Sequence, residues 1–110
     1  MAEKRRGHRI RVNLKARYQS EAAALEGWVN NLSRYGMFIR SDFLDDQGAQ
    51  VNVNLTIPGH DDPLQLVGEV VRVDTRPLSS GMGIRFSSMA TPIRRALANF
   101  MIERSYQALQ

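Results

Sequence analysis

Alternation of hydrophobic and polar residues is the strongest pattern in the first part of the chain. From Ile10 to Tyr18 every second residue is apolar, and the residues between them are basic or polar. A period of two is typical of a β-strand that buries one face. The same alternation returns over residues 51–57 and stops at Pro58-Gly59, which is a turn signal. Both segments are therefore predicted to be half-buried strands.

Four further strands are predicted from shorter or less regular patterns. Trp28 and Val29 belong to the second strand, but its start is ambiguous because three alanines in residues 19–26 favour a helix. The other three strands cover residues 36–40, 64–74 and 82–86. Gly68 interrupts the longest of them and indicates a bulge or a bend there.

The hydrophobic period changes in the last segment. Thr91 can cap a helix and Pro92 can occupy its first position, where the fixed φ of proline is already helical. Apolar residues then recur at a spacing of three or four, so we predict a helix over residues 91–107. Six strands followed by one helix predict an all-β fold with one C-terminal helix. We expect a six-stranded antiparallel β-barrel whose rim or side the helix covers.

Length and composition narrow the class of protein. A chain of 110 residues with 43% hydrophobic and 24% charged residues suits one globular domain. The absence of cysteine excludes disulfides and thiolate metal sites. No apolar run approaches the roughly 20 residues that span a bilayer, and no apolar stretch follows the basic N-terminus as in a signal peptide. We therefore expect a cytoplasmic protein without membrane insertion.

Positive charge is concentrated at the N-terminal end. Residues 1–20 contain seven Lys and Arg residues and one acidic residue, whereas the other 90 residues contain eight basic and ten acidic residues. The formal net charge of +4 is therefore a property of one end of the chain. An anionic ligand is expected near it.

Side chains that could carry catalysis are scattered. His8 and His60 are far apart and have no metal-ligand spacing, and the Asp45-Asp46 and Asp61-Asp62 pairs lie in turn-like contexts. The glycines of residues 81–83 do not form a phosphate loop, because no lysine or helix start follows them. The aromatic residues Trp28 and Phe38 are interpreted as core residues. We expect a binding protein with no cofactor and no catalytic site.

Two polar clusters remain as candidate binding residues. Residues 4–9 (KRRGHR) are rich in arginine, which pairs bidentately with phosphate oxygens and stacks on planar bases. Residues 31–36 (NLSRYG) combine short polar side chains, which can form a turn or bind a base edge, with a glycine. Taken separately, the first cluster is compatible with a solvated basic tail and the second with an ordinary turn.

Together, in this order and in a β-rich chain, the two clusters resemble the PilZ domain family. That family carries an Arg-x-x-x-Arg motif, matched here by Arg5 and Arg9, and then an Asp/Asn-x-Ser-x-x-Gly motif, matched by Asn31, Ser33 and Gly36. Residues 81–86 (GMGIRF) also look like the last strand of the family. The resemblance covers nearly the whole chain, from residue 4 through the C-terminal helix.

The resemblance implies a receptor for cyclic di-GMP. Residues 1–9 would be a flexible segment that wraps over the ligand and closes it against a barrel formed by residues 10–110. Arg5 and Arg9 would grip phosphates and stack on guanine, and Asn31 and Ser33 would contact a guanine edge or nearby ligand atoms. Gly36 would shape the turn. The domain would relay binding to an unidentified effector protein in motility, exopolysaccharide or biofilm control.

Three further residues are candidates in the same clusters, and one motif position departs from the usual pattern. Arg6 is an extra donor, and Lys4 and Arg34 are additional candidates; a basic residue at position 4 is what the resemblance associates with binding of an intercalated ligand dimer. The family often has Asp at the position of Asn31. A carboxylate can accept hydrogen bonds from two guanine N–H groups, whereas an amide offers one acceptor oxygen.

Two alternative functions stay open. A pI of about 10.1 and the basic face of the first strand are compatible with a small nucleic-acid-binding β-barrel. The few aromatic residues do not form a stacking platform on a basic strand, which argues against nucleic acid. The second alternative is a protein-binding adaptor with a vestigial nucleotide site.

Overall fold

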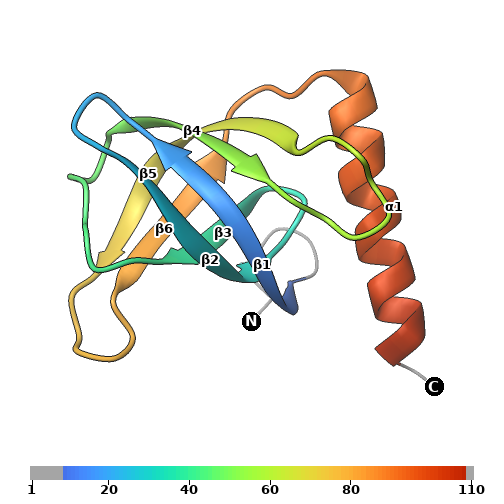
Figure 1. Cartoon of the computed structure of the whole chain (residues 1–110), viewed down its shortest axis with the longest axis horizontal. Coiled ribbons are helices and arrows are strands. Elements are labelled where there is room, and N and C mark those ends of the chain that lie inside the picture. Colours follow the sequence, from blue (N-terminus) through green and yellow to red (C-terminus); the bar gives the residue numbers. More distant parts are fainter. Residues whose placement is uncertain (1–8, 109–110) are drawn as a thin grey trace, which may run out of the picture.

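A computed structural model describes residues 9–108 and shows a closed barrel of six strands with one helix beside it (Figure 1). The strands are β1 (Ile10–Gln19), β2 (Ala24–Leu32), β3 (Gly36–Arg40), β4 (Gln50–Leu55), β5 (Leu64–Asp74) and β6 (Gly81–Phe86). The helix is α1 (Thr91–Ala108). The predicted fold class, an all-β barrel with one C-terminal helix, is confirmed.

Every neighbouring pair of strands is antiparallel, in the order β1-β2-β3-β6-β5-β4 around the barrel. The barrel closes where β1 pairs with β4, with Ala16 opposite Leu55. Closure removes the free sheet edges that an open sheet of this size would leave unpaired. In this order β2, β3, β6 and β5 are neighbours and form one curved face, on which the candidate site lies.

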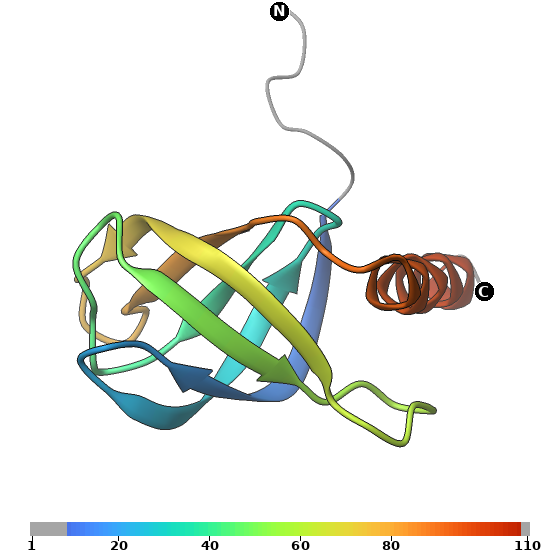
Figure 2. The same cartoon turned by 90° about the horizontal axis from the view of Figure 1, so that it is seen from above.

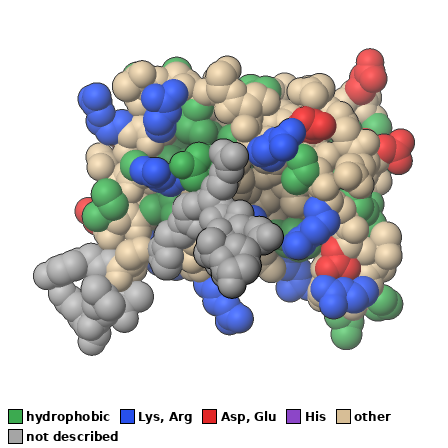
Figure 3. All heavy atoms as spheres, turned by 180° about the vertical axis from the view of Figure 1, so that it is seen from behind, with side chains coloured by type: hydrophobic (Ala, Val, Ile, Leu, Met, Phe, Trp, Pro, Cys, Tyr) green, Lys and Arg blue, Asp and Glu red, His purple; other side chains and the backbone are tan. Residues whose placement is uncertain are grey.

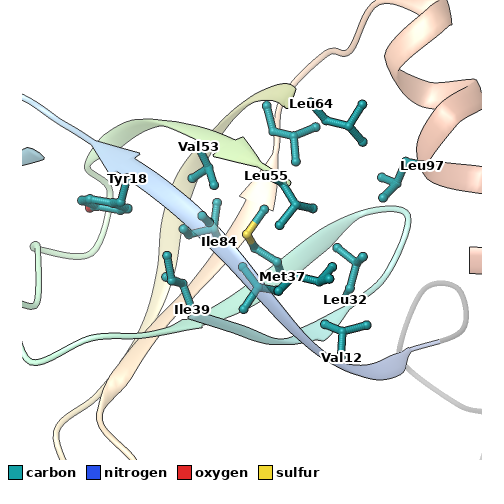
Figure 4. Close-up of a cluster of buried hydrophobic side chains, with 14 of the residues drawn as sticks. Val12, Tyr18, Leu32, Met37, Ile39, Val53, Leu55, Leu64, Ile84 and Leu97 are labelled. Atoms are coloured by element: carbon teal, nitrogen blue, oxygen red, sulfur yellow. The ribbon is translucent and has the colours of Figure 1, made fainter. Parts of the chain in front are cut away.

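Alternation along the strands builds the core. In β1 the buried residues from Val12 to Tyr18 occupy every second position, and the intervening basic and polar residues are exposed, as the sequence predicted. Figure 4 shows the inward side chains of all the strands meeting in one cluster, with Leu97 of α1 at one end and Tyr18 at the other. Hydrophobic burial inside the closed sheet is therefore the main source of stability.

Helix α1 lies to one side of the barrel, where Figure 2 shows it almost end-on. Its apolar residues Leu97, Phe100 and Met101 are buried and belong to the same core cluster as the strands. The predicted stripe at helical spacing is thus the face that packs on the barrel. In the described part of the chain, no helix is both long and apolar enough to span a membrane.

The structure resolves one ambiguity of the sequence interpretation and corrects two of its details. Residues 24–26 continue strand β2, because their pairing with the end of β1 outweighs the helix propensity of alanine. Trp28 is half exposed, since its neighbours Gly27 and Val29 point into the barrel. The bulge in β5 lies between Val70 and Arg72, not at Gly68, where glycine instead allows close approach to the Arg85 carbonyl oxygen.

A buried tyrosine fixes the long β3–β4 connection across the barrel end. The Tyr18 hydroxyl donates a hydrogen bond to Asp45 Oδ2 at 2.6 Å, and the backbone N–H of Asp45 points at the sulfur of Met82 at 3.3 Å. Burial and the bond to Asp45 raise the pKa of Tyr18, whereas hydrogen bonds from Ser20 and then Tyr18 lower the pKa of Asp45. One member of the Asp45-Asp46 pair therefore has a structural role.

Candidate ligand-binding site

The two sequence motifs meet at the start of β1. Arg9 lies directly before this strand, and Asn31 of β2 is the pairing partner of Arg11. Arg9 Nη1 donates a hydrogen bond to Asn31 Oδ1 at 2.7 Å. Two residues 22 positions apart in the sequence, each predicted as a ligand contact, are therefore in direct contact on the barrel surface.

Ser33 holds the turn between β2 and β3. It is 2% exposed, and its hydroxyl oxygen accepts the backbone N–H groups of Tyr35 and Gly36 at 3.1 Å each. Its own N–H donates to the Gly36 carbonyl oxygen at 2.8 Å. By accepting these backbone N–H groups, the Ser33 side chain fixes the backbone of the turn that follows Asn31. Its predicted contact with a ligand stays a prediction.

Gly36 is required by the close approach of two strands. A Cβ atom at this position would lie 2.4 Å from the carbonyl oxygen of Ile84 in β6. Glycine at this position therefore allows the close approach of the two backbones, and its predicted role in the ligand site stays a prediction. Arg34, in contrast, is exposed, and its guanidinium lies 5.8 Å from the centroid of the Tyr35 ring. It lines neither of the two surface hollows that lie beside Arg9.

Two adjoining hollows lie beside these residues. One, of about 230 Å³, is lined by Arg9, Ser33, Tyr35, Gly36, Met37, Phe38, Val71, Arg72, Gly83, Ile84 and Arg85. The other, of about 260 Å³, is lined by Arg9, Asn30, Asn31, Phe38, Arg40, Arg72, Asp74, Arg76 and Ser79. They share Arg9, Phe38 and Arg72, so they form one continuous surface region on the β2-β3-β6-β5 face.

Strand register explains why these residues gather. Asn31 pairs with Phe38, Phe38 with Gly83, and Gly83 with Arg72, which makes one row across four strands. Gly83 has no side chain, and the Arg72 guanidinium lies over the Phe38 ring, 5.3 Å from its centroid. Phe38 is buried, as predicted, but it lies in this outer row and outside the main core cluster.

The second hollow is strongly basic. Four arginines line it against one carboxylate, Asp74, and that carboxylate is paired with Arg76 at 2.6 Å. The hydrogen bond from Arg76 holds the pKa of Asp74 at about 2. Figure 3 views the molecule from behind, and Lys and Arg side chains are spread across this side of the molecule. The arrangement favours an anionic ligand.

Sequence interpretation missed four residues of this region: Phe38 as a site residue, Arg40, Arg72 and Arg76. Each stands alone in the sequence, and only the pairing of β3, β6 and β5 brings them to the Arg9–Asn31 contact. Of the predicted site residues, Lys4, Arg5 and Arg6 lie outside the described residues. Within residues 9–108, no three His, Cys, Asp or Glu side chains gather as they would around a metal ion.

A larger hollow, of about 840 Å³, lies on the other side of Arg40, beside the exposed Trp28. It contains none of the four described motif residues, Arg9, Asn31, Ser33 and Gly36. The position of the motifs, more than the volume of a hollow, therefore locates the candidate site.

The described motif residues Arg9, Asn31, Ser33 and Gly36 thus lie together on one basic face of a closed six-stranded barrel. The PilZ domain family matches residues 3–103, and the chain belongs to this family. PilZ domains are non-catalytic receptor domains that typically bind c-di-GMP.

Three solved structures are similar in fold. The Bacillus subtilis inhibitor of motility (MotI/DgrA) is 19% identical, with a TM-score of 0.80, over 96% of this chain and 53% of that one. YcgR from Escherichia coli in complex with c-di-GMP is 19% identical, with a TM-score of 0.74, over 96% and 48%. The PilZ domain of YcgR with c-di-GMP is 14% identical, with a TM-score of 0.68, over 98% and 99%.

The chain therefore spans about half the length of the inhibitor of motility and of YcgR, and it corresponds to one domain of each. At these identities the likeness concerns the fold. No curated protein sequence matches the chain significantly.

Proposed function

We propose that this PilZ domain binds cyclic di-GMP at the Arg9–Asn31 contact and the two hollows beside it, and that binding is relayed to a partner protein. The observation that carries the proposal is the hydrogen bond between Arg9 and Asn31, which joins the two motifs at the edge of a basic hollow. Arg5 and Arg6, with Lys4, would supply further donors to the phosphates from the segment before Arg9.

The chemistry of the ligand suits this region. Cyclic di-GMP carries two phosphate charges and two guanines, which offer large faces and edges with hydrogen-bond donors and acceptors. Guanidinium groups pair with phosphate oxygens and also stack on planar bases. Asn31 Oδ1 can accept one guanine N–H group when Arg9 turns to a phosphate. The ligand thus replaces the Arg9–Asn31 bond with bonds to both side chains.

The relay would follow from the position of the first motif. Residues 1–9 precede the barrel, and fixing them against its face would change the surface offered to a partner. In this proposal, contacts between the ligand and these residues make the ligand a switch. A non-enzymatic, cytoplasmic role in motility, exopolysaccharide or biofilm control is the setting we propose.

Calorimetry with cyclic di-GMP, GTP and a short oligonucleotide tests this function. We expect cyclic di-GMP to bind with micromolar or better affinity, about −8 kcal/mol, and the other two far more weakly. Tight binding of the oligonucleotide alone would favour a nucleic-acid-binding barrel. Absence of heat and of thermal stabilisation at about 100 μM cyclic di-GMP would leave an adaptor with a vestigial site.

A pair of arginine variants separates specific contacts from general basicity. Arg9→Ala should weaken binding of cyclic di-GMP greatly, because it removes a charged donor and a stacking group. Arg17→Ala is the control: Arg17 is exposed on β1, lines neither candidate hollow, and should change affinity by less than about 1 kcal/mol. Equal losses in both variants would mean that the ligand responds only to diffuse charge.

A further inference from the structure

The hollow of about 840 Å³ beside Trp28 lies outside the proposed ligand site. We refer to it as the Trp28 hollow. Its apolar lining comes from Leu25 and Trp28 of β2, Phe43 of the β3–β4 connection and Leu78 of the β5–β6 connection. Trp28 is 50% exposed and is the single tryptophan of the chain. Tryptophan is among the residue types that most often dominate the binding energy of protein interfaces.

Leu78 presents a second large apolar side chain to solvent beside this hollow. It is 93% exposed, and its backbone φ of 70° lies in the left-handed region, where a residue other than glycine is uncommon. Strain of this kind is frequent at ligand clamps and switch regions. The connection that carries Leu78 is tied to the start of the β3–β4 connection, because the Ser80 hydroxyl donates to the Ser41 carbonyl oxygen at 3.0 Å. Leu78 is therefore an apolar contact offered to a partner and not a core residue.

The extent of this surface suits a polypeptide segment better than a small molecule. A neighbouring hollow, of about 430 Å³, shares Leu25 and Glu26 with the Trp28 hollow and continues across β1 to β4. The two volumes together exceed the range of about 300–1,000 Å³ that is usual for small-molecule pockets. Four amide side chains line this path: Asn13, Asn30, Asn52 and Asn54. Because an amide has both donors and an acceptor, these side chains can bind the main chain of an extended segment.

The charges of the Trp28 hollow are opposite in balance to those of the ligand site. Two carboxylates, Glu26 and Asp42, line it against one arginine, whereas four arginines line the second ligand hollow against one carboxylate. Glu26 is paired with Lys15 at 3.5 Å, so the exposed Asp42 is the carboxylate that a cationic group of a partner would meet. Charge complementarity therefore favours a partner segment with Lys or Arg beside its apolar residue.

Arg40 connects the Trp28 hollow to the ligand site. It lines both the Trp28 hollow and the second ligand hollow, and its Nη2 donates a hydrogen bond to the Leu78 carbonyl oxygen. A phosphate bound in the ligand hollow attracts the same guanidinium. A shift of Arg40 toward the ligand would break its bond to Leu78 and release the turn that carries this leucine. Ligand binding would thereby change the apolar surface beside Trp28.

We propose that the Trp28 hollow is the docking surface for the partner protein, and that the partner contributes an extended segment with a large apolar residue beside a Lys or Arg. Trp28 and Leu78 contact the apolar side chain, Asp42 binds the cation, and Arg40 makes the affinity depend on cyclic di-GMP. This inference rests on the proposed function, because it supplies the surface through which ligand binding is relayed.

Selection of peptides from a random display library, with the whole chain as bait, tests this surface. Each enriched peptide is then titrated by calorimetry against the parent and four variants whose melting temperatures are also measured. Trp28→Ala removes the aromatic contact, Leu78→Asn removes the apolar side chain but tolerates the left-handed φ, and Asp42→Lys reverses the charge. Val67→Ser is the control, because Val67 is an exposed apolar residue of β5 that lines none of these hollows.

We expect the enriched peptides to carry a large apolar residue beside Lys or Arg. Their affinity should fall about tenfold or more in the three hollow variants and stay within about twofold in Val67→Ser. Binding should also shift the fluorescence of Trp28 in the parent. Saturating cyclic di-GMP should change the peptide affinity of the parent about threefold or more, and Arg40→Ala should remove this difference.

Each contrary result overturns a defined part of the proposal. Absence of enriched peptides, or peptides that bind folded Trp28→Ala like the parent, overturns the docking surface and leaves cyclic di-GMP binding standing. A dimer of the parent in light scattering that Trp28→Ala abolishes assigns the hollow to a second copy of the chain and also overturns it. Peptide affinity that the ligand does not change overturns the link through Arg40. Peptide binding by a parent that does not bind cyclic di-GMP overturns the proposed function and that link, and supports the docking surface.

Discussion

The hydrogen bond between Tyr18 and Asp45 gives a direct test of what holds the β3–β4 connection in place. Tyr18 is 1% exposed, and Asp45 is partly exposed and also bonded to Ser20. Tyr18→Phe keeps the aromatic ring in the core and removes only the hydroxyl. A hydrogen bond to a charged group contributes about 1.5–3 kcal/mol, and partial solvation of Asp45 favours the lower end. We expect a loss of about 1.5 kcal/mol.

The effect has a defined pH dependence. The lowered pKa of Asp45 means that its contribution to stability is complete above the usual carboxyl pKa near 4 and is lost as the pH falls below that value. The stability difference between the parent and Tyr18→Phe should therefore be largest near neutral pH and shrink below about pH 4. The raised pKa of Tyr18 adds stability that is complete below pH 10 and is lost at higher pH.

Thermal and urea unfolding at pH 7 and pH 3 measure both parts of this prediction. At pH 7 a loss of about 1.5 kcal/mol lowers the melting temperature by roughly 5–8 °C in a domain of this size. Tyr35→Phe is the matched control, because Tyr35 is 43% exposed and should melt like the parent. A parent-like melting temperature for Tyr18→Phe at pH 7, or an undiminished deficit at pH 3, would refute the role assigned to the carboxylate.

Substitutions at three further positions probe the fold and the site. Gly36→Ala places a Cβ 2.4 Å from the Ile84 carbonyl oxygen, so we expect urea unfolding to show a loss of about 2 kcal/mol or more. Lys15→Ala breaks an exposed pair with Glu26 at 3.5 Å, and the same measurement should change by less than about 1 kcal/mol. Asn31→Asp should hold or tighten cyclic di-GMP binding in calorimetry, and Asn31→Ala should weaken it about tenfold.

Local sequence patterns were sufficient for most of the fold. The bounds of β3 and β5 agree with the prediction, because each is a β-rich run bounded by turn residues. The start of β2 was ambiguous because alanine favours a helix, while the competing strand pairing with β1 is a tertiary interaction. Trp28 was assigned to the core from its hydrophobicity, although the inward positions of Gly27 and Val29 place it outside.

The candidate site was predictable only as far as its motifs. Arg9 and Asn31 were identified as parts of a recognisable spacing, and the structure places them in contact. Arg72 and Phe38 have no such spacing, because their contact depends on β3 and β5 both pairing with β6. A register shift of one residue would move either side chain to the opposite face of the sheet. Their position follows from the pairing of both strands with β6 and not from any local pattern.

The last strand shows how the fold and the site depend on each other. The glycines on either side of Met82 are residues of β6. Met82 points into the core, and Gly81 and Gly83 lie toward the site face. A Cβ at Gly81 would lie 2.6 Å from the Phe38 ring, so a larger residue would displace the support of Arg72. The strand that completes the barrel also leaves space for the hollow.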